Sequence, residues 1–139
     1  MLSPKFPITE AQIDTLVSAF YARAREHPVL GPVFHDAVGC DAEAWRRHEA
    51  RIASFWRNAI GLDRSFSGNP MLKHLSNKDI VPDQFADWLA LFHETAEEVL
   101  PDAAAAGITA LADRIGQSLQ MGLIQLRQKD SAPPRFFPA

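Results

Sequence analysis

The chain has 139 residues, of which 47% are hydrophobic, and carries a formal net charge of −3. This length and apolar content suit one domain with a hydrophobic core, and the small acidic excess gives no basic footprint for nucleic acid or an anionic membrane. A lone cysteine (Cys40), no signal peptide and no apolar run near the roughly 18 residues of a membrane span predict a cytoplasmic protein.

The first helix is predicted from a capping box formed by Thr9 and Gln12. Apolar residues at helical spacing follow it: Ile13, Leu16, Val17, Phe20, Tyr21 and Ala24. We expect this helix to end at His27, because the residue before a proline avoids the α conformation. Residues 29–34 then predict one irregular helical turn.

A second long helix is predicted between Asp41, a suitable N-cap, and Gly61, a suitable stop. Its inward stripe comprises Trp45, His48, Ile52, Phe55, Trp56 and Ala59. Residues 62–81 indicate a loop that holds a short helical turn near residues 71–75.

A third helix is predicted to begin at Pro82 and to end near Pro101. Its stripe comprises Phe85, Trp88, Leu89, Phe92, Ala96 and Val99. The last helix spans about residues 103–128 and turns inward Ile108, Leu111, Ala112, Ile115, Leu119 and Leu126. Residues 129–139 contain three prolines, which predicts a mobile tail behind a single domain of residues 1–128. With neither a strand pattern nor a repeat, the predicted class is all-α.

His74 stands in a short apolar turn with Met71, Leu72 and Leu75. A neutral histidine on a short rigid element, with apolar neighbours to cover a porphyrin face, is what a haem iron needs as a ligand. The alternative is a surface histidine in a polar loop.

Three residues on inward helix faces could donate hydrogen bonds to a small ligand opposite such a histidine: Tyr21, His48 and Trp88. Each also has an ordinary structural interpretation. Tyr21 could be a core tyrosine that bonds a backbone carbonyl, His48 an interfacial histidine with its tip in water, and Trp88 a core aromatic residue.

Other catalytic schemes find little support. The sequence has no HExxH, CxxC, glycine-rich phosphate loop or G-x-S-x-G motif. His27 and His35 are expected to be exposed to solvent, and His93 to lie at a helix edge.

Taken together and in order, several short motifs resemble those of the truncated haemoglobins, and within them the group III class. The motifs are Phe20-Tyr21, Leu30-Gly31-Pro32-Val33-Phe34, Trp45-Arg46-Arg47-His48, Phe55-Trp56, Gly68-Asn69-Pro70 with His74, and Trp88-Leu89-Ala90-Leu91-Phe92. The similarity runs from about Ile13 to Leu126. The chain contains no Gly-Gly pair, whereas other truncated classes carry paired glycines, and this favours group III.

The resemblance implies a shortened globin fold, a two-over-two helical sandwich around one haem b. It implies that His74 is the proximal iron ligand and that Tyr21, His48 and Trp88 line the distal pocket. Phe34 is then expected to pack against the porphyrin, with Met71 and Phe55 as further haem contacts.

A haem with this surrounding predicts binding of diatomic gases (dioxygen, carbon monoxide or nitric oxide) in a polar pocket, in a monomeric protein. A haem enzyme with peroxidase-like or nitric oxide dioxygenase activity is the alternative; it would need an external reductase, because the chain shows no flavin or nicotinamide domain. A haem-free helical interaction module is a third possibility.

Overall fold

The structure, a computed structural model, describes residues 5–62 and 83–131. These residues form five helices: α1 (Glu10–Ala24), α2 (Leu30–Val38), α3 (Ala42–Ile60), α5 (Gln84–Val99) and α6 (Asp102–Ser131). No strand occurs within these two ranges. The all-α prediction is therefore confirmed for the part of the chain that the structure describes.

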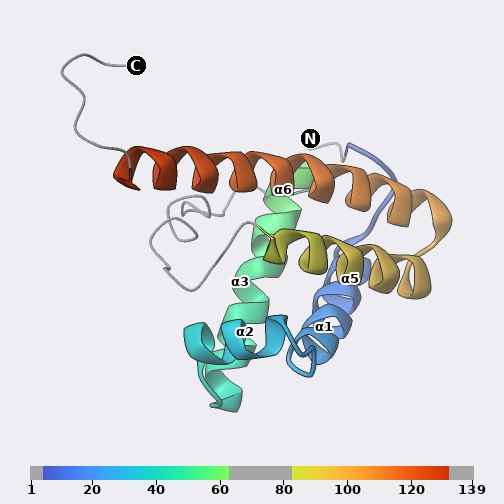
Figure 1. The fold of residues 1–139 in the computed structure, drawn as a ribbon. Helices are drawn as coiled ribbons and strands as arrows, with labels where there is room; N and C mark the ends of the chain where they lie inside the picture. Colours follow the sequence, from blue (N-terminus) through green and yellow to red (C-terminus); the bar gives the residue numbers. More distant parts are fainter. Residues whose placement is uncertain (1–4, 63–82, 132–139) are drawn as a thin grey trace.

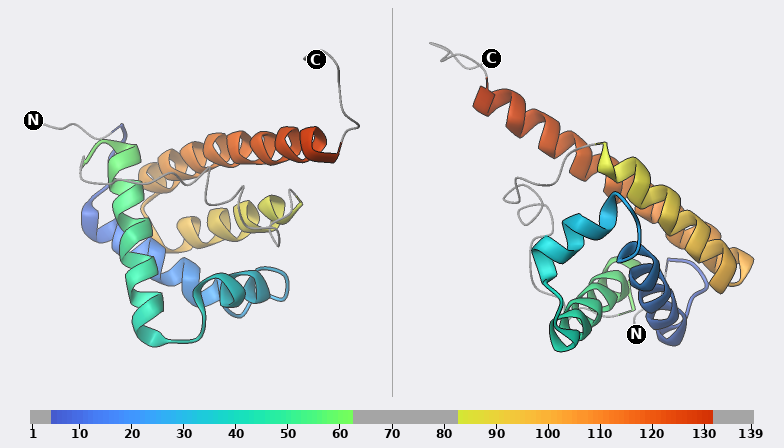
Figure 2. Two further views of the ribbon diagram at one scale, coloured as in Figure 1. Left: turned by 90° about the vertical axis from the view of Figure 1, so that its left-hand side faces the viewer. Right: turned by 60° about the horizontal axis from the view of Figure 1, so that its bottom comes forward.

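The helices form two layers. α5 and α6 run side by side in one layer, and α1 and α3 pair in the other (Figure 1). α1 also packs directly on α5, so it joins the layers, while the short α2 contacts α1, α3 and α5. Figure 2 shows that α6 continues past the other helices, and near that end Met121 and Ile124 are exposed. No helix in residues 5–62 or 83–131 combines the length and apolar character needed to cross a bilayer.

The start of α1 confirms the predicted capping box. The backbone N–H of Gln12 donates to Thr9 Oγ1 at 3.1 Å, and the Thr9 N–H donates to Gln12 Oε1 at 3.0 Å. Two backbone donors that a helix start would otherwise leave unpaired are thus satisfied.

Both predicted ends of α3 are also confirmed. Asp41 accepts a hydrogen bond from the Glu43 N–H at 3.3 Å. Gly61 takes the left-handed conformation with φ of 100°, and its N–H donates to the carbonyl groups of Arg57 and Asn58. Glycine adopts this conformation without a Cβ penalty, which explains why the helix stops here.

The connection between α1 and α2 differs from the prediction. α1 ends at Ala24, three residues before His27, because residues 25–27 tighten into a turn in which Glu26 and His27 bond carbonyls three residues back. The expected single turn at residues 29–34 is instead the nine-residue α2. His27 explains why a helix can begin here: its Nδ1 accepts from the N–H groups of Val29 and Leu30, both at 3.1 Å.

His27 and His35 are both half-buried, so the expectation that they are exposed was wrong. The ring of His27 is held at the start of α2 by the two hydrogen bonds it accepts. His35 lies on α2 rather than in a turn, and its Nε2 is 3.3 Å from the carbonyl oxygen of Arg25. The sequence pattern did not predict the partial burial of these two histidines, because it predicted a short turn at residues 29–34 in place of the longer α2.

The boundaries of α5 and α6 lie close to those predicted. α5 ends at Val99, and Leu100 is extended, with φ of −116° and ψ of 153°, as a residue before proline prefers. α6 begins one residue earlier than expected and extends three residues further, to Ser131. Pro82, the predicted start of the third helix, lies outside the described residues.

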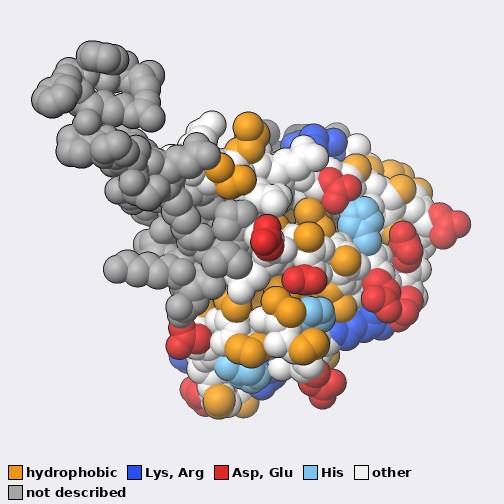
Figure 3. Space-filling model, in the orientation of Figure 1, with side chains coloured by type: hydrophobic (Ala, Val, Ile, Leu, Met, Phe, Trp, Pro, Cys, Tyr) orange, Lys and Arg blue, Asp and Glu red, His pale blue; other side chains and the backbone are white. Residues whose placement is uncertain are grey.

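The core lies between the two layers, around α1, which packs on both α3 and α5. Every residue of the stripe predicted for α1 is buried, as are Trp45 and Trp56 of α3, Phe85, Phe92 and Ala96 of α5, and Ile108, Leu111, Ala112 and Leu119 of α6. The rest of these stripes, including His48, Phe55 and Trp88, is only partly buried, and the Leu126 side chain is outside the description. Apolar side chains also gather on the face over α2 in Figure 3.

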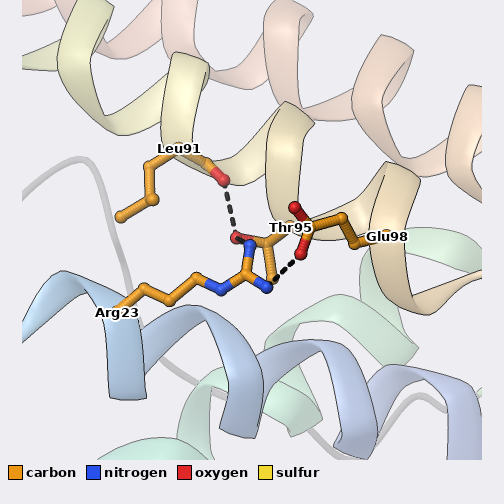
Figure 4. Close-up of polar contacts among 4 residues, drawn as sticks. All are labelled: Arg23, Leu91, Thr95 and Glu98. Carbon is orange, nitrogen blue, oxygen red and sulfur yellow. Dashed lines mark hydrogen bonds and ion pairs between the residues drawn. The ribbon is translucent and has the colours of Figure 1, made fainter.

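A polar contact ties α1 to α5 beside this core. The guanidinium of Arg23 donates to Thr95 Oγ1 at 3.4 Å and pairs with Glu98 (Figure 4). Thr95 is fully buried, and its hydroxyl donates to the Leu91 carbonyl at 2.7 Å. The only buried hydroxyl of α5 is therefore satisfied, as buried polar groups usually are.

Gly31 allows α2 to approach the end of α1 closely. A Cβ atom at this position would lie 2.8 Å from the carbonyl oxygen of Arg25. Backbone atoms cannot rotate away as a side chain can, so the two helices would have to separate. Gly116 is different, because the atoms nearest to its Cβ would be side-chain atoms of Leu89, with the two methyl carbons at 3.2 and 3.3 Å.

We expect Gly31→Ala to lower the free energy of unfolding by about 1–3 kcal/mol, the usual cost of forced overpacking. Gly116→Ala is the matched control and should be neutral or stabilising by up to about 1 kcal/mol, because alanine favours a helix. Urea unfolding of the two variants and the wild type measures both values. Equal stability of Gly31→Ala and wild type would show that α2 does not depend on this contact.

Candidate functional site

Four rings from three helices meet at one place, and we call them the polar aromatic cluster: Tyr21 of α1, Phe34 of α2, and Trp45 and His48 of α3. The Tyr21 ring meets His48 edge to face, with 4.9 Å between centroids, and Phe34 in the same manner at 5.4 Å. The Phe34 and His48 rings are 6.3 Å apart. The structure thus brings together three of the predicted site residues, which lie up to 27 positions apart in the sequence.

Tyr21 is buried, with 4% of its surface exposed. Burial raises the pKa of its phenol well above the ordinary value, and the nearby charge of Glu49 raises it further. Both effects disfavour the phenolate. The Tyr21 hydroxyl therefore keeps its proton and can act as a hydrogen-bond donor at this site.

Trp45 closes the other side of the cluster and is almost fully buried, at 1% exposure. Its centroid lies 5.9 Å from Tyr21 and 5.8 Å from His48. The indole N–H donates to the Gly39 carbonyl at 2.7 Å, and the Arg25 guanidinium lies over the indole, 4.4 Å from the ring centroid. This places a cation on the negative face of the ring.

Two charged residues border the cluster although no sequence motif marks them, namely Arg25 and Glu49. Burial raises the pKa of the Glu49 carboxyl, and the charge of Arg25 opposes this rise. Glu49 follows His48 directly on α3, so the sequence shows that it lies near a predicted site residue. Its proximity to Tyr21 depends on how α1 packs against α3, which the sequence does not show.

Trp88 belongs to a second group of rings, which is apolar. It stacks on Phe92 with 5.0 Å between centroids and an interplanar angle of 8°, and it meets Phe20 edge to face at 5.4 Å. Trp56 also belongs to this group, because its ring stacks on Phe92 with 5.2 Å between centroids. Phe20 lies 5.1 Å from Tyr21, so one ring connects Trp88 with the polar aromatic cluster.

Several apolar side chains pack on the core and yet keep part of their surface exposed. They come from α2, α3, α5 and α6 and include Phe34, Ile52, Phe55, Trp88, Leu89 and Ile115. Phe55 meets Trp56 edge to face at 5.4 Å. These side chains therefore pack on the core with one part of their apolar surface and leave the rest uncovered.

Two predicted site residues, His74 and Met71, lie outside the described residues. Among residues 5–62 and 83–131, no three His, Cys, Asp or Glu side chains gather as a metal site would require. His93 contacts Asp113 on α6, with 2.8 Å between Nε2 and Oδ1, which agrees with the predicted place at a helix edge.

Comparison with known proteins identifies relatives in one family. No family model matches the chain. The group 3 truncated haemoglobin ctb of Campylobacter jejuni is 34% identical over 88 residues, which are 63% of this chain and 69% of that protein.

A solved structure supports the same relationship. The crystal structure of group III truncated haemoglobin from Campylobacter jejuni superposes with a TM-score of 0.80 and 31% identity, and the match covers 84% of this chain and 92% of the other. This confirms the predicted truncated globin fold. The chain therefore belongs to the group 3 truncated haemoglobins, a globin family that implies a haem cofactor.

Proposed function

We propose that this protein binds haem b and holds a diatomic gas (dioxygen, carbon monoxide or nitric oxide) in a polar distal pocket formed by Tyr21, His48 and Trp88. The observation that carries the proposal is the pairing of two hydrogen-bonding rings, Tyr21 and His48, at 4.9 Å inside an aromatic cluster. Membership of the haemoglobin family supports a haem as the group that such a pair would face.

The residues fit a haem in two respects. The partly exposed apolar side chains of α3, α5 and α6, among them Phe55 and Trp88, suit the flat apolar faces of a porphyrin. Phe34 joins this wall beside Tyr21. For the side that coordinates iron we propose His74, with Met71 as apolar cover, on the basis of the sequence motif around them.

A bound haem supplies an iron with one coordination position for the gas. The chain contributes the polar environment of that position. A tyrosine phenol with its ordinary pKa of about 10 is protonated throughout the physiological pH range, and burial raises the pKa of Tyr21 further, so its hydroxyl can donate a hydrogen bond there. His48 can donate a second hydrogen bond through a ring nitrogen, and Trp88 a third through its indole N–H.

Each neutral hydrogen bond contributes about 1 kcal/mol net. Two or three donors could therefore slow ligand release by one to two decades, at about 1.4 kcal/mol per decade. Such a pocket suits tight binding of oxygen better than rapid exchange. We further propose that the protein is a cytoplasmic monomer. It consists of one globin domain (residues 1–128) and a C-terminal tail, and an external electron donor reduces the iron.

The first test is haem uptake. Protein purified with adequate haem should show a Soret band that shifts when the ferrous form binds carbon monoxide. We expect His74→Ala to lose stably bound haem, because alanine lacks the imidazole that we propose as iron ligand. His93→Ala is the matched control and should retain haem, since His93 lies against Asp113 on α6. An unchanged spectrum in His74→Ala would remove His74 as the ligand.

The second test concerns Tyr21. We expect Tyr21→Phe to raise the dissociation rate of oxygen about fivefold, the equivalent of about 1 kcal/mol for one lost hydrogen bond. Carbon monoxide accepts hydrogen bonds weakly, so its dissociation rate should change less. Stopped-flow measurement with both gases gives the two rates, and equal changes for the two gases would argue against a hydrogen bond from Tyr21.

The third test uses the raised pKa of Tyr21. A group whose pKa is raised by folding stabilises the folded state below its unfolded pKa, and this stabilisation is lost as the pH rises. For tyrosine the unfolded pKa is about 10, so the loss should reach about 1.4 kcal/mol per pH unit above that value. Tyr21→Phe should not show this component. Urea unfolding of both proteins across the alkaline range measures it, and parallel curves would contradict it.

A further inference from the structure

We propose that Trp45 is a positioning residue that holds Tyr21 and His48 as one unit. This inference rests on the proposed function, because it concerns the two residues assigned to the gas ligand. Trp45 itself is buried behind them and is not proposed to touch the gas or the haem.

The position of Trp45 on α3 determines one of its contacts. Trp45 and His48 are three residues apart on a helix, so their side chains lie on the same face. Their rings meet edge to face at 5.8 Å. Tyr21 reaches the same indole from α1 at 5.9 Å, and it also meets His48 at 4.9 Å. The three rings therefore form a closed triangle in which each restrains the other two.

The indole is itself fixed from outside the triangle. Its N–H donates to the Gly39 carbonyl at 2.7 Å, which ties α3 to the end of α2, where Gly39 has a positive φ of 94°. The Arg25 guanidinium covers the ring from the end of α1. The His35 ring lies 5.9 Å away, also from α2. Contacts from α2 and from the ends of α1 and α2 thus converge on one side chain of α3.

The hydrogen bond from the Trp45 indole N–H to the Gly39 carbonyl distinguishes Trp45 from a purely apolar core residue. Phenylalanine would keep an apolar ring at this position but would lose the bond to Gly39 and weaken the cation–π contact. The ring would then be free to tilt, and Tyr21 and His48 would gain freedom with it. Leaving the Gly39 carbonyl unpaired adds to this loosening.

The chain contains a single tyrosine, so a spectroscopic label on tyrosine reports on this site alone. Fluorotyrosine incorporated into the full chain should give one fluorine NMR signal. The signal can be recorded with and without haem, which separates the positioning role from gas binding.

The test compares Trp45→Phe with Trp56→Phe. Trp56 is the matched control because it lies on the same helix, is also buried, and stacks on Phe92 away from the polar aromatic cluster. We expect Trp45→Phe to shift or broaden the fluorotyrosine signal and to change the oxygen dissociation rate about threefold or more. Trp56→Phe should leave both nearly unchanged, whatever its effect on stability.

A double-mutant comparison identifies the route of the effect. If Trp45 acts through Tyr21 and His48, the kinetic effect of Trp45→Phe should disappear when both are replaced, in a Tyr21→Phe, His48→Leu background. An equal kinetic effect in both backgrounds would overturn the inference, as would equal fluorine shifts in Trp45→Phe and Trp56→Phe.

Two further results keep the test decisive. If Trp45→Phe fails to fold, Arg25→Gln removes the cation from the indole at a half-exposed position, and an unmoved fluorotyrosine signal would then overturn the inference. If the wild type takes up no haem, the proposed function fails. The fluorine comparison in the haem-free protein then still decides whether Trp45 positions Tyr21.

Discussion

The structure depends on one helix being buried on two sides. α1 packs on α3 in its own layer and on α5 in the other, so its inward face must satisfy two different neighbours. Consecutive residues divide this task. Phe20 contacts the apolar rings of Trp88 and Phe92, while Tyr21 contacts His48 and Trp45. Because Phe20 and Tyr21 are adjacent on α1 and their rings are in contact, the packing of the core and the geometry of the candidate site are linked.

The chemistry of the site follows from this burial. Tyr21 is surrounded by rings and carries a hydroxyl that the low-dielectric surroundings keep protonated. This hydroxyl is a hydrogen-bond donor, and a gas ligand on a haem is the acceptor that we propose for it. Arg25 and Glu49 add opposite charges beside the cluster: the Arg25 guanidinium lies over Trp45, and the charge of Glu49 acts on Tyr21.

The short α2 connects these features. It begins where His27 accepts two backbone hydrogen bonds, approaches α1 closely at Gly31, and ends at Gly39, whose carbonyl receives the Trp45 indole. Each contact is local and small. Together they set the position of Phe34 against Tyr21 and fix the end of α2 on α3. Contacts to the backbone of α2 and its ends therefore contribute, together with the ring contacts, to the geometry of the polar aromatic cluster.

The sequence by itself determined the long helices, the start of α1 and both ends of α3, because the Thr9 capping box, the Asp41 cap and the Gly61 stop act through neighbouring residues only. It also identified the family through motifs that include Tyr21, Phe34 and His48, and it predicted His74 as iron ligand, which lies outside the described residues. Only the tertiary structure decided the length of α2, the partial burial of His27 and His35, and the contacts of Arg25 and Trp45. Those features arise from contacts between helices, and residue spacing along one helix carries no information about which neighbour its face will meet.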